Sequence, residues 1–337
     1  MATFTGTAAN ETITPSVVSS TVTRNPPGSL PSDASDTIYG NGGADTLDGG
    51  GGDDIIYGDD FFGTIAGNDT IFGGAGNDTI RTGNGSNTVD GGAGNDKIAG
   101  GSGTDTITGG LGDDHISGEG GNDTITGGAG NDIIYGDDFF GTGTGNDTIS
   151  YASATAGVTV NLSLTAAQNT IGAGIDTLRS LENLTGSNFN DTLTGSSGNN
   201  VLSGGGGNDT LNSGSGNDTL IGGIGVDTLT GGLGSDLFDY NSVNESPVGA
   251  GRDKIVGFAG NGALAGDRID LTTIDANTLV VGNQAFIFGG PFTAGHLQYV
   301  GGILKGNTDG DAAAEIEIQL VGAPALSVGG AGTDILL

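Results

Sequence analysis

The stretch that decides the fold is Gly73-Gly74-Ala75-Gly76-Asn77-Asp78-Thr79-Ile80-Arg81, which returns in altered form as Gly109-Gly110-Leu111-Gly112-Asp113-Asp114-His115-Ile116-Ser117. Both follow G-G-x-G-x-D-x-U-x, in which U is an apolar residue. Eleven such nonapeptides, interrupted by two six-residue insertions, keep one register over residues 40–150, and six more fill residues 186–239. A period held this long indicates a repeat architecture and argues against disorder.

Each nonapeptide divides into a turn and a short strand. Glycine tolerates positive φ and close backbone approach, so the first six residues form a turn whose carbonyls can face an ion. In the three-residue strand the central apolar residue points inward and its neighbours point outward. Two repeats complete one coil, and coils stack at about 4.8 Å. The sequence therefore predicts an all-β fold, a right-handed parallel β-roll, with inward residues such as Ile80, Ile98, Ile107, Ile116 and Leu211.

The sixth position of the repeat carries an aspartate, and these acids should stack along the two edges of the roll. Stacked carboxylates repel unless a cation lies between them, and calcium accepts six to eight oxygens in tolerant geometry. We predict about a dozen Ca²⁺ ions, with weaker or empty sites beside Asn87 and Asn200. The predicted carboxylate ligands are Asp45, Asp54, Asp69, Asp78, Asp96, Asp105, Asp114, Asp123, Asp132, Asp147, Asp191, Asp209, Asp218, Asp227 and Asp236. The glycines predicted to contribute are Gly73, Gly91, Gly100, Gly109, Gly127, Gly204, Gly222 and Gly231.

Composition agrees with a cation partner. The 337 residues include 72 glycines, and 40 acidic residues face 8 lysines and arginines, for a formal charge of -32. Nucleic acid is an unlikely partner because phosphate binding needs clustered basic residues. The chain has no cysteine, its start shows no cleavable signal peptide, and no apolar run is long enough to span a bilayer.

The repeats resemble the RTX, or haemolysin-type, calcium-binding proteins. That resemblance implies a roll that is unfolded without calcium, leaves the cell through type I secretion machinery and folds outside. Residues 253–258, 267–271, 284–288 and 307–320 are similar to the C-terminal region of serralysin-type proteases, and Asp334-Ile335-Leu336-Leu337 resembles the end of a type I secretion signal. The alternation of Ile316, Ile318 and Leu320 and a hairpin over 297–304 favour a C-terminal β cap.

Catalytic motifs of known hydrolases are not found. The chain has two histidines, His115 and His296, and no H-E-x-x-H, G-x-S-x-G or phosphate-binding loop motif. We therefore predict a secreted, non-enzymatic calcium-binding protein of a surface, matrix or host-interaction type. Two alternatives stay open: the secretion and folding module of an extracellular protease, lipase or polysaccharide-modifying enzyme, and an ice-binding protein that uses outward threonines such as Thr106 and Thr124.

The two insertions are nearly identical loops, Gly58 to Thr64 and Gly136 to Thr142. An even number of repeats separates them, so they should lie on the same edge. Either each aromatic pair folds back over its own edge, or the pairs contact a cell-surface glycan, protein or lipid. The residues concerned are Phe61, Phe62, Phe139 and Phe140.

The domain organisation follows from where the repeat holds. Residues 1–35 are predicted to form a degenerate coil, with Glu11 in the aspartate position, and a loop. Residues 36–239 form the roll, in which 40–150 and 186–239 are the regular arrays and 151–185 are widened coils with a strand running from Val158 to Leu164. Residues 240–337 form the cap and secretion-signal region. Asn307 to Glu315 alternates oxygen donors and is either a further calcium loop or an acidic turn.

Overall fold

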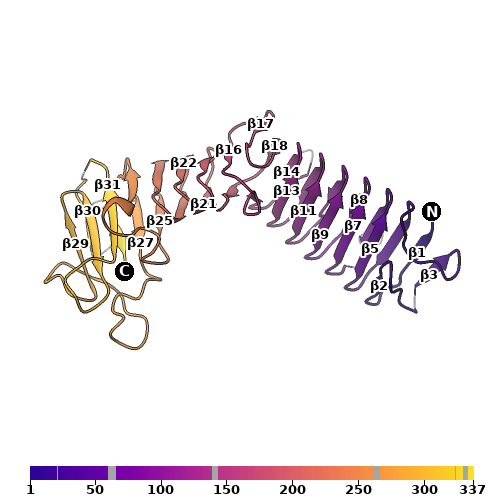
Figure 1. The fold of residues 1–337 in the computed structure, drawn as a ribbon, viewed down its shortest axis with the longest axis horizontal. Coiled ribbons are helices and arrows are strands. Elements are labelled where there is room, and N and C mark those ends of the chain that lie inside the picture. The colour runs from indigo at the N-terminus through magenta and orange to yellow at the C-terminus, as the bar shows by residue number, and fades with distance from the viewer. Residues whose placement is uncertain (21, 60–65, 139–142, 261–265, 323, 329–332) are drawn as a thin grey trace. The chain divides into compact units, whose positions relative to one another are not determined.

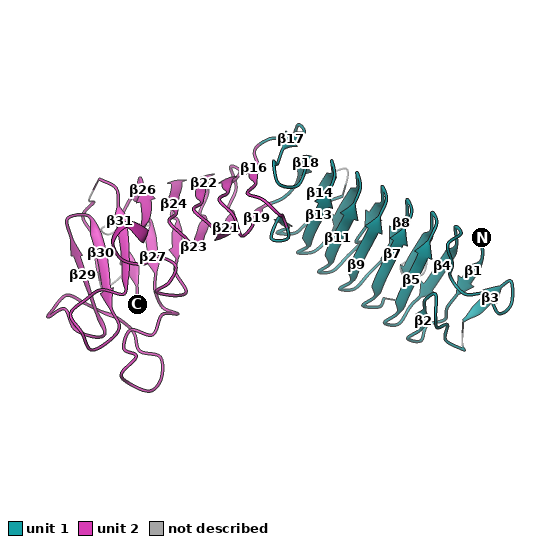
Figure 2. Cartoon of the chain, in the orientation of Figure 1, with its two compact units in different colours: residues 1–153, 164–181 teal, residues 154–163, 182–337 magenta. Residues whose placement is uncertain are grey.

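The computed structural model describes residues 1–20, 22–59, 66–138, 143–260, 266–322, 324–328 and 333–337. The chain divides into two compact units, residues 1–153 with 164–181 and residues 154–163 with 182–337 (Figure 2). Within the described ranges the elements are β-strands apart from one 3₁₀ turn, η1 at Gly249–Gly251. No helix in these ranges is long and apolar enough to cross a membrane.

Unit 1 consists of two stacks of short strands, and along the repeats the chain alternates between them (Figure 1). Neighbouring strands within each stack are parallel, except for the antiparallel pairs β1–β3 and β17–β18. The first sheet runs β17 (Gln168–Asn169), β18 (Ile175–Arg179), β14 (Ile133–Asp137), β12 (His115–Glu119), β10 (Lys97–Ala99), β8 (Thr79–Arg81), β6 (Ile55–Asp59), β4 (Thr37–Asn41), β1 (Thr3–Thr5) and β3 (Thr23–Asn25). The second runs β2 (Thr12–Ile13), β5 (Thr46–Gly51), β7 (Thr70–Ala75), β9 (Thr88–Ala93), β11 (Thr106–Leu111), β13 (Thr124–Ala129) and β15 (Thr148–Ser150).

Unit 2 repeats this arrangement and then closes it. One sheet contains β19 (Asn183–Thr185), β21 (Val201–Gly206), β23 (Thr219–Ile224), β25 (Leu237–Asp239), β27 (Arg268–Asp270) and β32 (Ile335–Leu336), in that order. The other contains β16 (Thr159–Asn161), β20 (Thr192–Thr194), β22 (Thr210–Ser215), β24 (Thr228–Leu233), β26 (Asp253–Val256), β31 (Ile316–Leu320), β30 (Ile303–Asn307), β29 (His296–Val300) and β28 (Ile287–Phe288). The predicted class, a parallel β-roll with a C-terminal β cap, is confirmed.

The core is one apolar side chain deep on each strand. Ile80 pairs in register with Ile98, which in turn pairs with Ile116, and all three are buried. Ile107 and Leu211 hold the same place in their own sheets, so the predicted inward positions are confirmed. Such a thin core contributes about 2 kcal/mol for each fully buried side chain, and the coils depend on further interactions at their edges.

The backbone requires glycine at the second and fourth positions of the repeat. Gly74 and Gly76 have φ values of 105° and 138°, which side chains rarely adopt. A Cβ on Gly74 would also lie 2.1 Å from the carbonyl oxygen of Gly50 in the preceding coil. These glycines therefore let successive turns stack in direct backbone contact.

The cap in unit 2 replaces parallel coils by antiparallel strands. β30 pairs antiparallel with both β29 and β31, and Gly301 and Gly302 form the turn with φ values of 61° and 83°. This is the hairpin predicted over 297–304. The antiparallel ladder covers an edge of the parallel sheet that would otherwise expose unpaired backbone groups.

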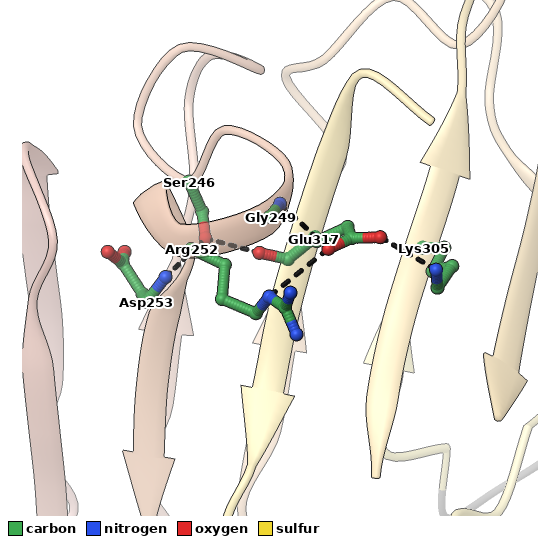
Figure 3. A network of polar contacts seen from close by, with 6 residues as sticks. All are labelled: Ser246, Gly249, Arg252, Asp253, Lys305 and Glu317. Carbon is green, nitrogen blue, oxygen red and sulfur yellow. Dashed lines mark hydrogen bonds and ion pairs between the residues drawn. The ribbon is translucent and has the colours of Figure 1, made fainter. Parts of the chain in front are cut away.

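A buried carboxylate ties the cap strands to η1 (Figure 3). Glu317 Oε1 lies 2.7 Å from Lys305 Nζ, and its Oε2 lies 3.1 Å from Arg252 Nε and accepts a hydrogen bond from Gly249 N–H at 3.0 Å. Burial opposes the charge, but the Lys305 and Gly249 hydrogen bonds and both cations outweigh it and lower the pKa of Glu317. Ser246 Oγ donates to the Glu317 carbonyl at 2.5 Å. The cap is thus held by polar contacts among its own side chains.

Two local predictions differ from the structure. β16 ends at Asn161 and does not reach Leu164, which is 45% exposed, because Asn161 Oδ1 accepts a hydrogen bond from Ser163 N–H and turns the chain. Residues 15–35 are more than a loop, since β3 pairs antiparallel with β1 and Arg24 lies opposite Phe4.

Candidate calcium sites

The repeat aspartates form continuous ladders of backbone to carboxylate hydrogen bonds. Asp78 N–H donates to Asp96 Oδ1 at 2.8 Å, and Asp96 N–H donates to Asp114 Oδ1 at the same distance in the next coil. Every pair of neighbours along the predicted edges is linked in this way, and Asn87 takes an aspartate's place in its row. The predicted order of acids along each edge is confirmed.

The ladders extend beyond the repeats that the sequence identified. Glu11 N–H donates to Asp45 Oδ1, which confirms the place assigned to Glu11. Asp36 N–H donates to Asp54 Oδ1, and Asp132 N–H donates to Asp176 Oδ1. In unit 2, Asp253 and Asp267 continue the rows in the same manner. The sequence signal for these members is the short ending D-x-U, as in Asp36-Thr37-Ile38 and in Asp176-Thr177-Leu178, where it marks a return of the repeat.

One carboxylate oxygen of most ladder aspartates is left without a partner. The Oδ2 atoms are buried and have no hydrogen-bond partner among the described residues. A buried carboxylate oxygen without a donor or cation is strongly unfavourable, so these atoms indicate a missing positive charge. The aspartates concerned are Asp45, Asp54, Asp69, Asp78, Asp96, Asp105, Asp114, Asp123, Asp132, Asp209, Asp218, Asp227, Asp236 and Asp253.

The electrostatics of the metal-free chain point to the same need. Burial, aided by neighbouring aspartates of the ladder, raises the pKa of Asp105 and Asp114 to about 7, although backbone hydrogen bonds oppose the shift. Burial raises the pKa of Asp253 to about 8. Near neutral pH the ladders therefore carry charge that the protein alone does not compensate.

In most repeats a glycine at the first position lies beside the free oxygen; Thr82 and Ser213 take its place in two repeats. A Cβ on Gly109 would lie 2.4 Å from Asp114 Oδ2 and 2.5 Å from the carbonyl oxygen of Gly127. An unpartnered carboxylate oxygen and a carbonyl oxygen of the next coil therefore converge beside this glycine, and oxygen donors of this kind and charge fit Ca²⁺. In each of the following repeats, the Oδ2 atom of the repeat's own aspartate lies within 2.2–2.7 Å of the Cβ position at the first glycine: Gly73, Gly91, Gly100, Gly109, Gly127, Gly204, Gly222 and Gly231. Gly40, Gly49, Gly58 and Gly118, which the predicted set omits, border their aspartates in the same way.

Several acids near the ends of the ladders are satisfied by the protein itself. Asp36 Oδ2 accepts a hydrogen bond from Ser32 N–H at 3.0 Å, and Asp176 Oδ2 accepts from Tyr151 Oη at 3.0 Å. Asp191, predicted as a ligand, accepts from Ser187 N–H at Oδ2 and from Ser187 Oγ at Oδ1. We infer that the need for a cation is concentrated in the interior coils.

The repeat over residues 82–90 is built differently. Thr82 replaces the first glycine, is fully buried, and its hydroxyl donates to the carbonyl oxygen of Gly100. Asn87 replaces the aspartate, accepts from Asp69 N–H and donates to Gly85 O. A side chain thus occupies the space that stays open beside the other first glycines. Asn200 is similarly engaged, since its Nδ2 donates to Glu182 O at 2.6 Å.

Restoring the repeat in this unit is expected to create a calcium site. Thr82→Gly combined with Asn87→Asp reopens the space and supplies a carboxylate, so the ion count should rise by about one over wild type. Equilibrium dialysis with elemental analysis measures the count. Asn87→Asp alone retains the threonine and serves as the matched control, for which we expect no increase. An unchanged count in the double variant would refute our interpretation of Thr82.

Other candidates stand apart from the ladders. Asp309, Asp311 and Glu315 bring carboxylate oxygens within 4.8 Å of one another, but backbone donors already engage them, such as Thr308 N–H at Glu315 Oε2. His115 is exposed on β12, as expected for a surface residue. The Phe61–Phe62 and Phe139–Phe140 pairs lie outside the described residues.

Buried acid ladders along the turns of parallel coils define a calcium-binding β-roll. The family of RTX calcium-binding nonapeptide repeats matches residues 32–65, 64–98, 99–134, 118–149, 185–220 and 210–238, more than half of the chain. The chain belongs to this family. Among solved structures, it is similar to the AlgE6R3 subunit of the Azotobacter vinelandii mannuronan C5-epimerase, with 29% identity and a TM-score of 0.33, over 44% of this chain and 78% of that one. No curated protein matches it.

Proposed function

We propose that this chain is a secreted protein that folds on calcium outside the cell and acts, without a catalytic site of its own, as a surface, matrix or host-interaction component. The observation that carries the proposal is the run of buried, unpartnered Oδ2 atoms beside open first glycines. Aspartate carboxylates with glycine carbonyls from the next coil would hold about a dozen ions. Bound calcium supplies the charge that allows the acid edges to stack.

The dependence of folding on calcium supports an extracellular location for this protein. A chain with a formal charge of -32 and a core one residue deep is poorly held without cations, so its folding should follow the calcium concentration. Scarce calcium inside the cell would keep it unfolded for type I export, and abundant calcium outside would fold it. The resemblance of residues 334–337 to a secretion signal supports the same route.

The calcium concentration that drives folding tests this proposal. We expect a titration followed by far-ultraviolet circular dichroism to show a midpoint at about 10⁻⁴–10⁻³ M, the range of extracellular calcium modules, with no transition in equimolar magnesium. A midpoint below about 10⁻⁶ M would contradict it, because the chain would then fold before export. Assays of the calcium-loaded protein for protease, lipase and polysaccharide-modifying activity test the non-catalytic part.

A further inference from the structure

The outer face of the first sheet of unit 1 concentrates the positive charge of that unit. The seventh and ninth repeat positions point outward, and their register brings unlike side chains together across β4 to β18. Of the 8 lysines and arginines in the chain, three lie on this face. We define the basic–tyrosine face as Tyr39, Tyr57, Arg81, Lys97, His115, Tyr135 and Arg179.

Equivalent positions on the second sheet of the same unit are occupied differently. Its seventh-position row consists of threonines, paired in register as Thr88, Thr106 and Thr124 are. Its ninth-position row includes Asp48, the exposed Phe72 and Asp90, and no basic residue. Because the two faces are built from the same repeat, the fold does not require basic or aromatic residues on either one. The difference therefore indicates a ligand on the first face.

The side chains of this face are arranged for contact. Tyr39 and Tyr57 stack with ring centroids 5.1 Å apart and 3° between their planes. The His115 ring lies 5.8 Å from the Tyr135 ring, and the Arg179 guanidinium lies 5.8 Å from the same ring, so the buried Tyr135 contacts both side chains. These residues lie on β4, β6, β12, β14 and β18 of one sheet.

A shallow hollow of about 290 Å³ lies between these groups. Arg81, Lys97, His115, Ser117 and Glu119 all line it. The basic side chains are exposed, and neither Arg81 nor Lys97 forms an ion pair with a described residue. The Arg81 charge also acts on Glu119, whose pKa burial raises and this charge lowers, so Lys97 is the cation of this hollow that has no carboxylate partner among the described residues.

We propose that the basic–tyrosine face binds a linear acidic polysaccharide, a glycan chain that carries carboxylates on its sugar rings. Guanidinium and ammonium groups pair with carboxylates, the half-buried Tyr39–Tyr57 pair contacts the sugar rings, and Ser117 Oγ, which donates its hydrogen to the Asp137 carbonyl, accepts a hydrogen bond from a sugar hydroxyl. The rows run across successive strands at about 4.8 Å, which suits an extended polymer. This inference rests on the calcium-folded state of the proposed function.

The spacing of the basic residues favours an acidic polysaccharide over nucleic acid as the ligand of this face. The ladders place rows of carboxylates on both edges, and phosphate binding requires denser clusters of basic residues than this face provides. A polysaccharide spaces its charges between hydroxyl-bearing rings, which matches a few cations set among tyrosines, serine and threonines. Single-stranded DNA is therefore the competing polyanion that the test includes.

The test measures binding of the calcium-loaded full chain to hyaluronate, with dextran as the neutral probe and an oligothymidylate as the nucleic-acid probe. We expect hyaluronate to bind at low ionic strength and dextran and oligothymidylate not to bind. Arg81→Ser with Lys97→Ser should weaken hyaluronate binding roughly tenfold, since each exposed charge pair contributes modestly. Lys254→Ser with Arg268→Ser removes two exposed cations from unit 2 and should leave binding unchanged.

Each other outcome has a defined meaning. Failure of wild type to bind hyaluronate, equal binding by the Arg81/Lys97 variant, or an equal loss in the Lys254/Arg268 control would overturn the inference. Tight binding of oligothymidylate would show a general polyanion surface and would also overturn it. Circular dichroism of every variant in calcium shows whether the protein is folded. A protein that does not fold in calcium contradicts the proposed function, whereas a folded protein that does not bind hyaluronate contradicts the inference about the basic–tyrosine face.

Discussion

Removal of calcium at neutral pH is expected to abolish nearly all β-sheet in this protein. Fourteen buried Oδ2 atoms have no partner among the described residues. An uncompensated buried charge costs several kcal/mol, whereas whole domains are stable by about 5–15 kcal/mol. A few empty interior sites are therefore enough to unfold the roll. Circular dichroism of protein decalcified by exhaustive dialysis, compared with the same sample after calcium is restored, measures the change.

Without calcium, the stability of the folded protein is expected to decrease as the pH rises. Burial, aided by neighbouring aspartates, raises the folded-state pKa of Asp45 and Asp209 from 3.8 to about 7. A group with a raised folded-state pKa contributes stability that is fully present below its unfolded pKa and is lost as pH rises through the folded one. Without calcium, β structure should therefore return on acidification from pH 8 to pH 4. With calcium, acidification should release ions, because protonation competes with binding.

Two results would contradict this account. One is a decalcified protein that keeps its full β signal at pH 7.5, and the other is equal recovery with magnesium. Magnesium is the decisive control because it demands a stricter octahedron and keeps its water, which converging carboxylates and backbone carbonyls do not suit. Recovery with magnesium would mean that the ladders need charge alone and not oxygen coordination.

The nine-residue period made the edges of the roll predictable. Two repeats per coil place every second aspartate on one edge, so the order Asp78, Asp96, Asp114 follows from counting, as do inward residues such as Ile80 and Ile116. The register fixes these positions because a shift of one residue would turn each apolar side chain outward. The cap hairpin was predictable because alternation and paired glycines mark it locally.

Features that depend on pairing across coils were not predictable from one repeat. Asp36 and Asp253 were missed as ladder members because neither follows a complete G-G-x-G turn: no glycine precedes Asp36 within its repeat, and Val248 takes the place of the first glycine before Asp253. Thr82 fills the space beside Asn87, which is visible only once Gly100 of the next coil lies against it. The basic–tyrosine face joins Arg81 to Lys97 across strands, although a different repeat carries each of them.

Gly109→Ala is expected to lose calcium and several kcal/mol of stability, although it adds a single methyl group. The new Cβ would lie 2.4 Å from Asp114 Oδ2 and 2.5 Å from the Gly127 carbonyl oxygen. Contacts this short force the carboxylate or the next coil to move, and either movement separates the two oxygens that should share an ion. Overpacking and a displaced ligand together should cost about 3 kcal/mol, with at least one ion lost.

Gly120→Ala is the matched control for this variant. Its Cβ would meet no heavy atom closer than 3.8 Å, and Gly120 is not among the positive-φ glycines, so stability should change by less than about 0.5 kcal/mol and the ion count should not change. Calcium-loaded urea unfolding and elemental analysis compare the two. If Gly109→Ala kept the wild-type ion count, the space beside the first glycine would not be where calcium binds. Equal losses in both variants would mean that the coil tolerates no added methyl group, whatever lies beside it.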